Sequence, residues 1–137
     1  MTKKEALELL SYHSGRNSDI YNEKWKSGFL GMLRPFIGRL SDENFIEIME
    51  CLKVLTSDFK NKELNHDLIS DVWGMQHYSN MWVEKGGMLE TVMTEEQKQL
   101  IKKWTGIISY TVICLLANSE EAFYEYEDYL EEKSKGN

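Results

Sequence analysis

The sequence predicts an all-α fold: a single compact helical bundle of about six helices that spans residues 1–137. Three observations support this fold class. One proline and nine glycines leave too few turn residues for an all-β protein. Apolar side chains recur at helical spacing in successive segments, and no internal repeat divides the chain. A length of 137 residues allows one hydrophobic core and is short for two.

The first expected helix runs from Thr2, which would cap it, to His13. After a turn-rich segment at 14–19, residues 22–40 predict one long amphipathic helix, because their apolar positions fall within about 120° of arc. Pro35 should bend this helix, since proline has no N–H to donate. The apolar positions are Trp25, Phe29, Met32, Leu33, Phe36, Ile37 and Leu40.

A neighbouring face of the same segment carries residues almost without side chains. Such a face allows another backbone, or a flat ligand, to come close. Close helix packing is the interpretation we favour, either within the chain or across a homodimer through the Gly28, Gly31 and Gly38 face; a ligand cleft is the alternative. Arg34 would suit an anion or carboxylate partner, although an exposed arginine needs none. The small residues are Ser27, Gly28, Gly31, Pro35 and Gly38.

Two further helices are expected in the middle of the chain. Ser41 should cap a third helix with Phe45 and Leu55 among its inward residues. Asn65 should cap a fourth helix that ends near Val83, before two consecutive glycines.

The last two helices follow from clear boundary signals. Thr94 and Gln97 form a capping box for a fifth helix at 95–117, whose second half is apolar on nearly all sides. We therefore expect this helix to be the central element of the bundle. Ser119 should cap the final helix, and the tail at 132–137 should be frayed.

The end of the fourth helix is the first candidate site. Its last two turns are apolar or aromatic on every side, which a solvent-exposed helix would not tolerate. A buried helix end is the interpretation we favour. The alternative is a pocket for a small ligand or a peptide, with aromatic walls and a few polar anchors. The pocket residues would be Trp73, Gln76, His77, Tyr78, Asn80 and Trp82.

The final helix is the second candidate site, because it carries the net charge of the chain. Residues 119–132 contain seven acids and no base, so the rest of the chain, with 16 acids and 16 bases, is neutral. An acidic surface with exposed tyrosine would attract a basic protein partner. A solvated face that keeps the protein soluble is the alternative. The partner face would comprise Glu121, Tyr124, Glu125, Asp128 and Glu132.

Other function classes receive little support from the sequence. There is no catalytic nucleophile motif, phosphate loop or CxxC, so we expect no catalytic residues and no cofactor. The three histidines form no HxxxH pair, and we expect no metal site. Nucleic-acid binding is disfavoured, because phosphate contacts need clustered Lys and Arg and the lysines here form only small, scattered groups. The longest apolar run, 107–117, is too short to cross a membrane, so no membrane association is expected.

These observations predict a cytoplasmic protein, because Cys51 and Cys114 suit small buried thiols in a reducing compartment. The leading functional hypothesis is a protein-binding module of a regulatory or toxin-neutralising type that uses the acidic C-terminal helix. The alternative is a small-molecule-binding protein or an enzyme with a pocket in the 73–82 segment.

Overall fold

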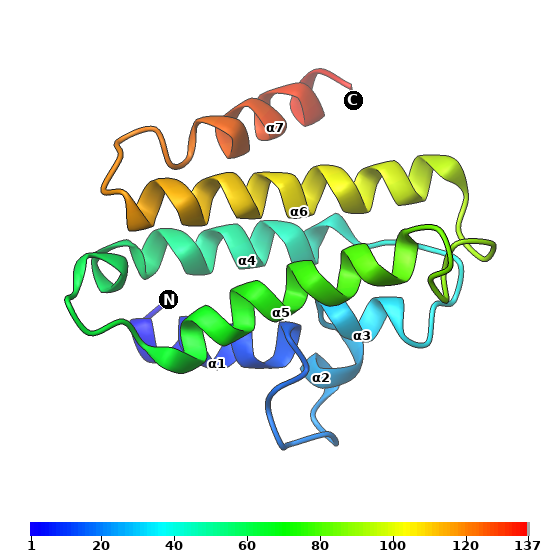
Figure 1. Ribbon diagram of the computed structural model, residues 1–137, viewed down its shortest axis with the longest axis horizontal. Helices are drawn as coiled ribbons and strands as arrows, with labels where there is room; N and C mark the ends of the chain where they lie inside the picture. The colour runs from blue at the N-terminus through cyan, green and yellow to red at the C-terminus, as the bar shows by residue number, and fades with distance from the viewer. Residues whose placement is uncertain (137) are drawn as a thin grey trace.

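The computed structural model describes residues 1–136, and all regular structure in this part of the chain is helical. The predicted all-α fold class is therefore confirmed, with seven α-helices and one 3-10 helix among the described residues (Figure 1). The elements are α1 (Lys3–His13), α2 (Glu23–Ser27), α3 (Phe29–Leu33), α4 (Asp42–Val54), η1 (Thr56–Lys60), α5 (His66–Val83), α6 (Glu95–Leu116) and α7 (Tyr124–Lys135).

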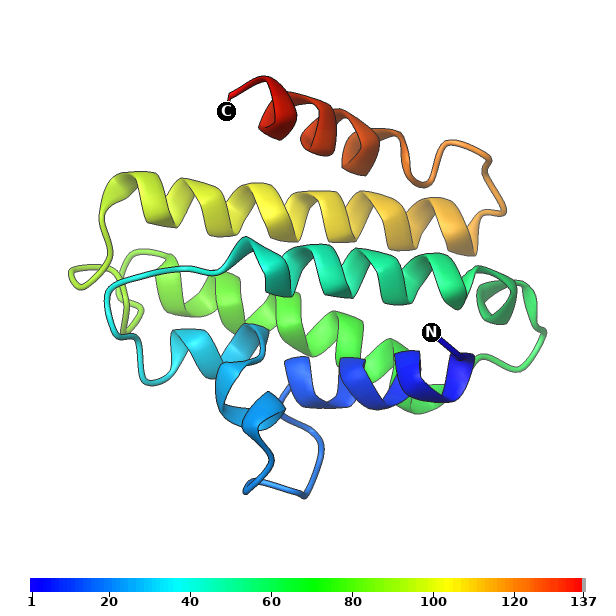
Figure 2. The same ribbon diagram turned by 180° about the vertical axis from the view of Figure 1, so that it is seen from behind.

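The longer helices stack in layers. Helix α7 lies along α6, α6 lies along α4 and α5, and α1 covers the far side of α4 and α5 with the short α2 and α3 beside it (Figures 1 and 2). Figure 2 shows α4 on one side of the molecule, whereas α5 lies on the other. Helix α6 thus lies between α7 and α5, while α7 also packs directly on α4, where the rings of Tyr129 and Phe45 are 4.9 Å apart between centroids.

Trp104 of α6 lies at the centre of the core and is fully buried. Its ring stacks on Phe45 of α4 at 5.8 Å between centroids and meets the edge of Phe29 of α3 at 6.1 Å. Its indole Nε1 donates a hydrogen bond to the hydroxyl of Tyr129 on α7 at 3.0 Å. One side chain therefore joins three other helices, and the polar atom brought into the core is paired.

Helix boundaries that depend on local capping are found where the sequence predicts them. The Thr2 hydroxyl accepts from the backbone N–H of Glu5, and the Asn65 side chain accepts from that of Leu68. Thr94 and Gln97 complete a reciprocal capping box at the start of α6. Ser41 occupies the N-cap position of α4, but its side chain makes no capping hydrogen bond.

The long helix predicted at 22–40 is wrong. The chain forms the five-residue α2, turns at Gly28, forms the five-residue α3, and is not helical from 34 to 41. The break is fixed from a distance: Nδ1 of His13 accepts the backbone N–H of Phe29 at 3.0 Å. Ile37, expected on the buried face, is 73% exposed because its segment has left the helix.

The small residues of this segment do allow close approach, and the neighbour is the chain itself. A Cβ placed on Gly31 would lie 2.4 Å from the carbonyl oxygens of Trp25 and Lys26, so α3 packs directly against the end of α2. Gly38 has a φ of +99° and faces open space. Association of two copies through the Gly28, Gly31 and Gly38 face stays a prediction.

The C-terminal region differs from expectation in two places. Helix α6 is not enclosed on all sides, since Ile113 is 64% exposed and Leu116 is 46% exposed. The final helix begins at Tyr124 rather than after Ser119, whose hydroxyl instead accepts from the backbone N–H of Glu121 in a turn. At its other end α7 continues to Lys135, through residues expected to fray; Asn137 lies outside the described residues.

Candidate functional site

The six residues predicted for a pocket on α5 lie on two sides of that helix. Trp73, Gln76, His77 and Asn80 line a hollow of about 420 Å³ together with Ser109 of α6. Tyr78 and Trp82 border a different cavity, of about 500 Å³, on the side facing the loop after α1 and the α2–α3 region. None of the three hollows that these residues border is lined by all six, because side chains about 100° apart on a helix diverge.

The expectation that this helix end is buried is wrong. Trp73 is 71% exposed, and Tyr78 and Met81 are also exposed. Buried positions such as Met75 and Ser79 occupy the remaining side of the helix, which faces the bundle. Helix α5 is an outer helix of the bundle, and its aromatic side chains are consequently presented to solvent rather than covered by the 84–93 loop.

The acidic residues of α7 lie beside two lysines of α6. Glu125, Asp128 and Glu132 line a groove that also contains Lys102 and Lys103. Glu132 pairs with Lys103 at 3.2 Å, whereas Glu125 and Asp128 form no ion pair with any side chain of residues 1–136. All three carboxylates are exposed, as are Glu121 and Tyr124. The groove thus retains negative charge that the protein itself does not neutralise.

The α5 hollow and the α7 groove meet on the outer side of α6. Ser109 borders the hollow, and Gly106, about one turn earlier in α6, borders the groove. The hollow and the groove are therefore only about one helical turn apart along α6. Ile113 continues the same exposed stripe one turn beyond Ser109. The two surfaces that the sequence suggested separately therefore form one face, which we call the α5–α6–α7 face. Helix α6 contacts both α5 and α7; in Figure 1, α7 lies above α6 and α5 below it, with part of α4 visible between α6 and α5.

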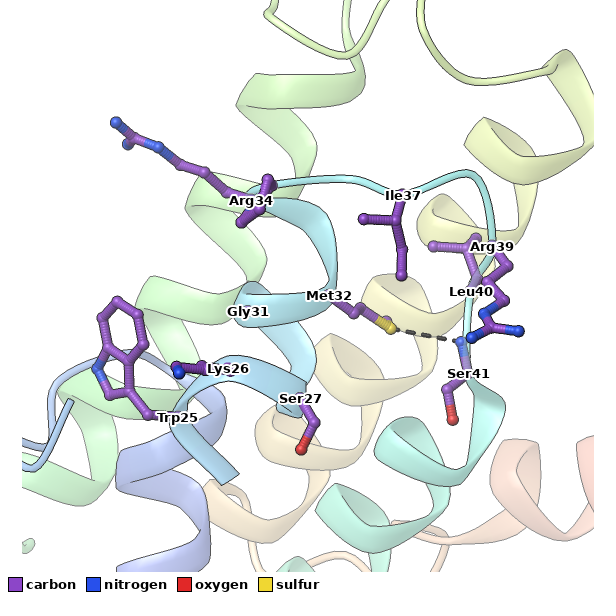
Figure 3. A pocket seen from close by; sticks show the side chains of 11 residues that line it. Trp25, Lys26, Ser27, Gly31, Met32, Arg34, Ile37, Arg39, Leu40 and Ser41 are labelled. Atoms are coloured by element: carbon purple, nitrogen blue, oxygen red, sulfur yellow. Dashed lines mark hydrogen bonds between the residues drawn. The ribbon is translucent and has the colours of Figure 1, made fainter. Parts of the chain in front are cut away.

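A third site was missed by sequence reasoning because it depends on the broken helix at 22–40. Met32 of α3 and Ile37 and Leu40 of the following segment project into a cavity of about 620 Å³ (Figure 3). In Figure 3, Trp25 and Arg34 lie at one end of this cavity and Arg39 at the other. The sequence contained one usable signal: residues 24–41 carry four bases and no acid in a chain of net charge −7.

A partly buried hydrogen-bonded network around His13 holds α2 and α3, whose residues line this third site. His13 is 1% exposed, and since its Nδ1 accepts from Phe29 its Nε2 is the nitrogen that donates to Glu47, at 2.8 Å. Lys24 of α2 also donates to both carboxylate oxygens of Glu47 at 2.9 Å. The hydrogen bond from His13, assisted by Lys24, lowers the pKa of Glu47 to about 2. The network connects α1, α2, α3 and α4.

A second buried acid holds the loop after α1. Asp71 of α5 is 1% exposed and accepts two hydrogen bonds from the guanidinium of Arg16, at 2.7 and 3.1 Å, and one from the hydroxyl of Ser14 at 2.9 Å. Such paired geometry satisfies a carboxylate that would otherwise be costly to bury. The network anchors a loop and leaves no carboxylate free for proton transfer.

The described residues offer little for catalysis or metal binding. No cluster of three or more His, Cys, Asp or Glu side chains within residues 1–136 is arranged to hold a metal ion. Cys51 is fully buried, and burial raises the pKa of its thiol to about 12, which suits packing rather than nucleophilic attack. No helix in the described chain has the length and apolar character needed to cross a membrane.

Comparison with protein-family models, with curated proteins and with solved structures finds no match to this chain.

Proposed function

We propose that this chain is a cytoplasmic protein-binding module of a regulatory or toxin-neutralising type, which binds a basic protein through the α5–α6–α7 face. The observation that carries the proposal is the exposure of Trp73, at 71%, and of Ile113, at 64%, on one face with uncompensated acids. The two buried, unpaired cysteines support a reducing compartment.

The apolar part of the face has the composition of an interface centre. Tryptophan, tyrosine and methionine are enriched where proteins bind one another, and lysine is depleted. Trp73 and Met81 of α5 and Ile113 of α6 present large side chains to solvent, with the small residues Gly106 and Ser109 beside them. A partner side chain can reach the α6 backbone at Gly106, because a Cβ placed on this residue would have nothing within 4 Å.

The acidic part of the face argues for a basic partner. Glu125 and Asp128 line the groove that contains Gly106 and have no cation of residues 1–136 within ion-pairing distance. Such rim charges raise the rate of association with a positively charged partner and make the complex sensitive to salt. They also disfavour partners with acidic surfaces.

The test begins with tagged protein expressed in its own host and recovered at low salt. We expect one basic protein to be recovered with the wild type. The double variant Trp73→Ala/Ile113→Ala should not bind it. The double variant Glu125→Lys/Asp128→Lys should release it at a lower salt concentration than the wild type does. The matched control is Tyr21→Ala, since Tyr21 is 86% exposed but lies outside the face. All four substituted residues of the test variants are exposed, so the fold should be retained; circular dichroism checks this.

The outcomes separate the proposal from its alternatives. A partner that binds wild type, control and both face variants equally would show that the face is not the interface. Recovery of no partner, with a low-salt complex absent by native mass spectrometry, would also count against it.

A small molecule in the α5 hollow is the second candidate. It is favoured by the convergence of Trp73, Gln76, His77 and Asn80 with Ser109 on one hollow of about 420 Å³. Native mass spectrometry of the gently purified protein distinguishes the two: a small extra mass, absent from His77→Ala, supports the ligand, whereas a second polypeptide supports the protein-binding function.

A further inference from the structure

The cavity beside α3 exists because of how the 22–41 segment is folded. Gly31 packs against the carbonyl end of α2, so no side chain rises from the floor at this point. The chain then turns away after Arg34 and returns to α4 at Ser41, with Gly38 at φ +99°. This extended return leaves a space of about 620 Å³, within the range of small-molecule sites.

The lining of this cavity is apolar along its length. Met32 and Leu40 are partly buried within it, and Ile37 is 73% exposed although it projects inward in Figure 3. Met32 is held in place by its sulfur, which accepts weak hydrogen bonds from the Asn44 amide at 3.3 Å and from the Ser41 backbone N–H at 3.4 Å. An apolar ligand here would remove the Ile37 side chain from water, which is favourable.

The charges that line the cavity are all positive. Lys26, Arg34 and Arg39 border it, no acid does, and none of the three pairs with an acidic side chain of residues 1–136. Lys24, the other base of the segment, is by contrast held by Glu47. A protein with a net charge of −7 thus presents unneutralised cations at an apolar hollow, which selects for a ligand with an anionic group and a hydrocarbon part.

One end of the cavity is suited to the anionic group. Trp25, Gly31 and Arg34 line both this cavity and the neighbouring one of about 500 Å³, so the two hollows meet there. The indole N–H of Trp25 is buried and has no acceptor among residues 1–136. An oxygen anion at this end could pair with the guanidinium of Arg34, which is exposed and has no acidic partner among residues 1–136.

We propose that this cavity binds a fatty-acid-type ligand, a single hydrocarbon chain ending in a carboxylate. The carboxylate pairs with Arg34 at the end of the cavity that Trp25 also borders, and the chain crosses Gly31 to contact Met32, Ile37 and Leu40. The cavity beside α3 is separate from the α5–α6–α7 face, and ligand binding there does not depend on the protein-binding function.

The experiment is calorimetric titration of the full chain with sodium dodecanoate below its micelle concentration, with dodecanol as the uncharged analogue. We expect saturable binding of one dodecanoate per chain and weaker binding of dodecanol. Arg34→Gln should weaken dodecanoate binding by about three- to tenfold, as should Ile37→Ser. The matched controls are Lys60→Gln and Val92→Ser, two exposed residues that do not line the cavity, and both should bind as the wild type does.

A spectroscopic measurement locates the carboxylate. Among the indole signals of the four tryptophans, the Trp25 resonance, assigned by its loss in Trp25→Phe, should move on addition of dodecanoate. Absence of saturable binding, equal affinity for dodecanol, or unchanged binding by Arg34→Gln and Ile37→Ser would each overturn the proposal. So would binding to vesicles of anionic phospholipid, lost in those two variants, without binding of free dodecanoate: the 34–41 segment would then be a membrane contact.

Discussion

Replacing Glu47 by glutamine should reduce the stability of the fold in a pH-dependent way. The carboxylate accepts hydrogen bonds from buried His13 at 2.8 Å and from Lys24 at 2.9 Å. Its pKa in the folded protein is about 2, below the 4.5 of an unperturbed glutamate. A pKa lowered by folding means that the charged form stabilises the fold above pH 4.5 and that this stabilisation is lost as the pH falls toward 2.

The size of the effect follows from the same pKa values. The difference between 4.5 and about 2 corresponds to about 3 kcal/mol at neutral pH. Screening at a side chain that is 27% exposed reduces this to about 2–3 kcal/mol. At about pH 3 less than half should remain, because the unfolded chain is then largely protonated at this position while the folded protein still is not. Glutamine keeps an oxygen acceptor for His13, so the charge is the main change.

Urea-induced unfolding of wild type and Glu47→Gln at about pH 7 and about pH 3 measures the effect. The control is Glu8→Gln, an exposed glutamate of α1, for which we expect a change of less than about 0.5 kcal/mol at both pH values. Two results would refute the reasoning: a loss of unfolding free energy in Glu47→Gln that is the same at both pH values, or a loss below about 0.5 kcal/mol at neutral pH. Either would show that the carboxylate charge contributes nothing to folding.

Three further predictions concern the core and its polar groups. Tyr129→Phe leaves the buried indole N–H of Trp104 without its acceptor and should cost about 1–3 kcal/mol, measured by urea unfolding; a neutral result would show that another acceptor or water replaces the hydroxyl. In a Cys114→Ser background, the buried Cys51 thiol, with its pKa raised to about 12, should react with a disulfide reagent near pH 8 only as fast as the protein unfolds. Rapid labelling of the folded protein would contradict this. Asp71→Ala removes the acceptor of three hydrogen bonds from the loop after α1 and should lower the melting temperature and speed proteolysis within that loop; unchanged digestion would show that the loop is held by other contacts.

Most helix boundaries could be predicted from the sequence because they depend on neighbouring residues. The Thr2 and Asn65 caps and the Thr94–Gln97 box each satisfy backbone N–H groups within three residues, so the signal and the structure involve the same short stretch. The end of α6 is similarly local, because Asn118 adopts a φ of 56°, a conformation that asparagine tolerates.

The break at Gly28 was decided by a contact that periodicity cannot reveal. The pattern of 22–40 suits a helix, but the Phe29 N–H is taken by His13, which lies 16 residues earlier in the chain. The competing hydrogen bond exists only when α1 and α3 are packed together. The cavity beside α3 is a consequence of that break, so its positive charge could be read from the sequence but its shape could not.

The sequence by itself determined the helical class, most caps and the concentration of acid near the C-terminus. Only the tertiary structure decided which apolar positions are covered: Trp104 lies in the core, whereas Trp73, equally apolar and equally within a helix, is 71% exposed. The physical reason is that helical periodicity identifies an apolar face but contains no information about whether another element of the chain packs against it. For that reason the union of the α5 and α7 surfaces into one face, and the cavity beside α3, became visible only when the helices were placed together.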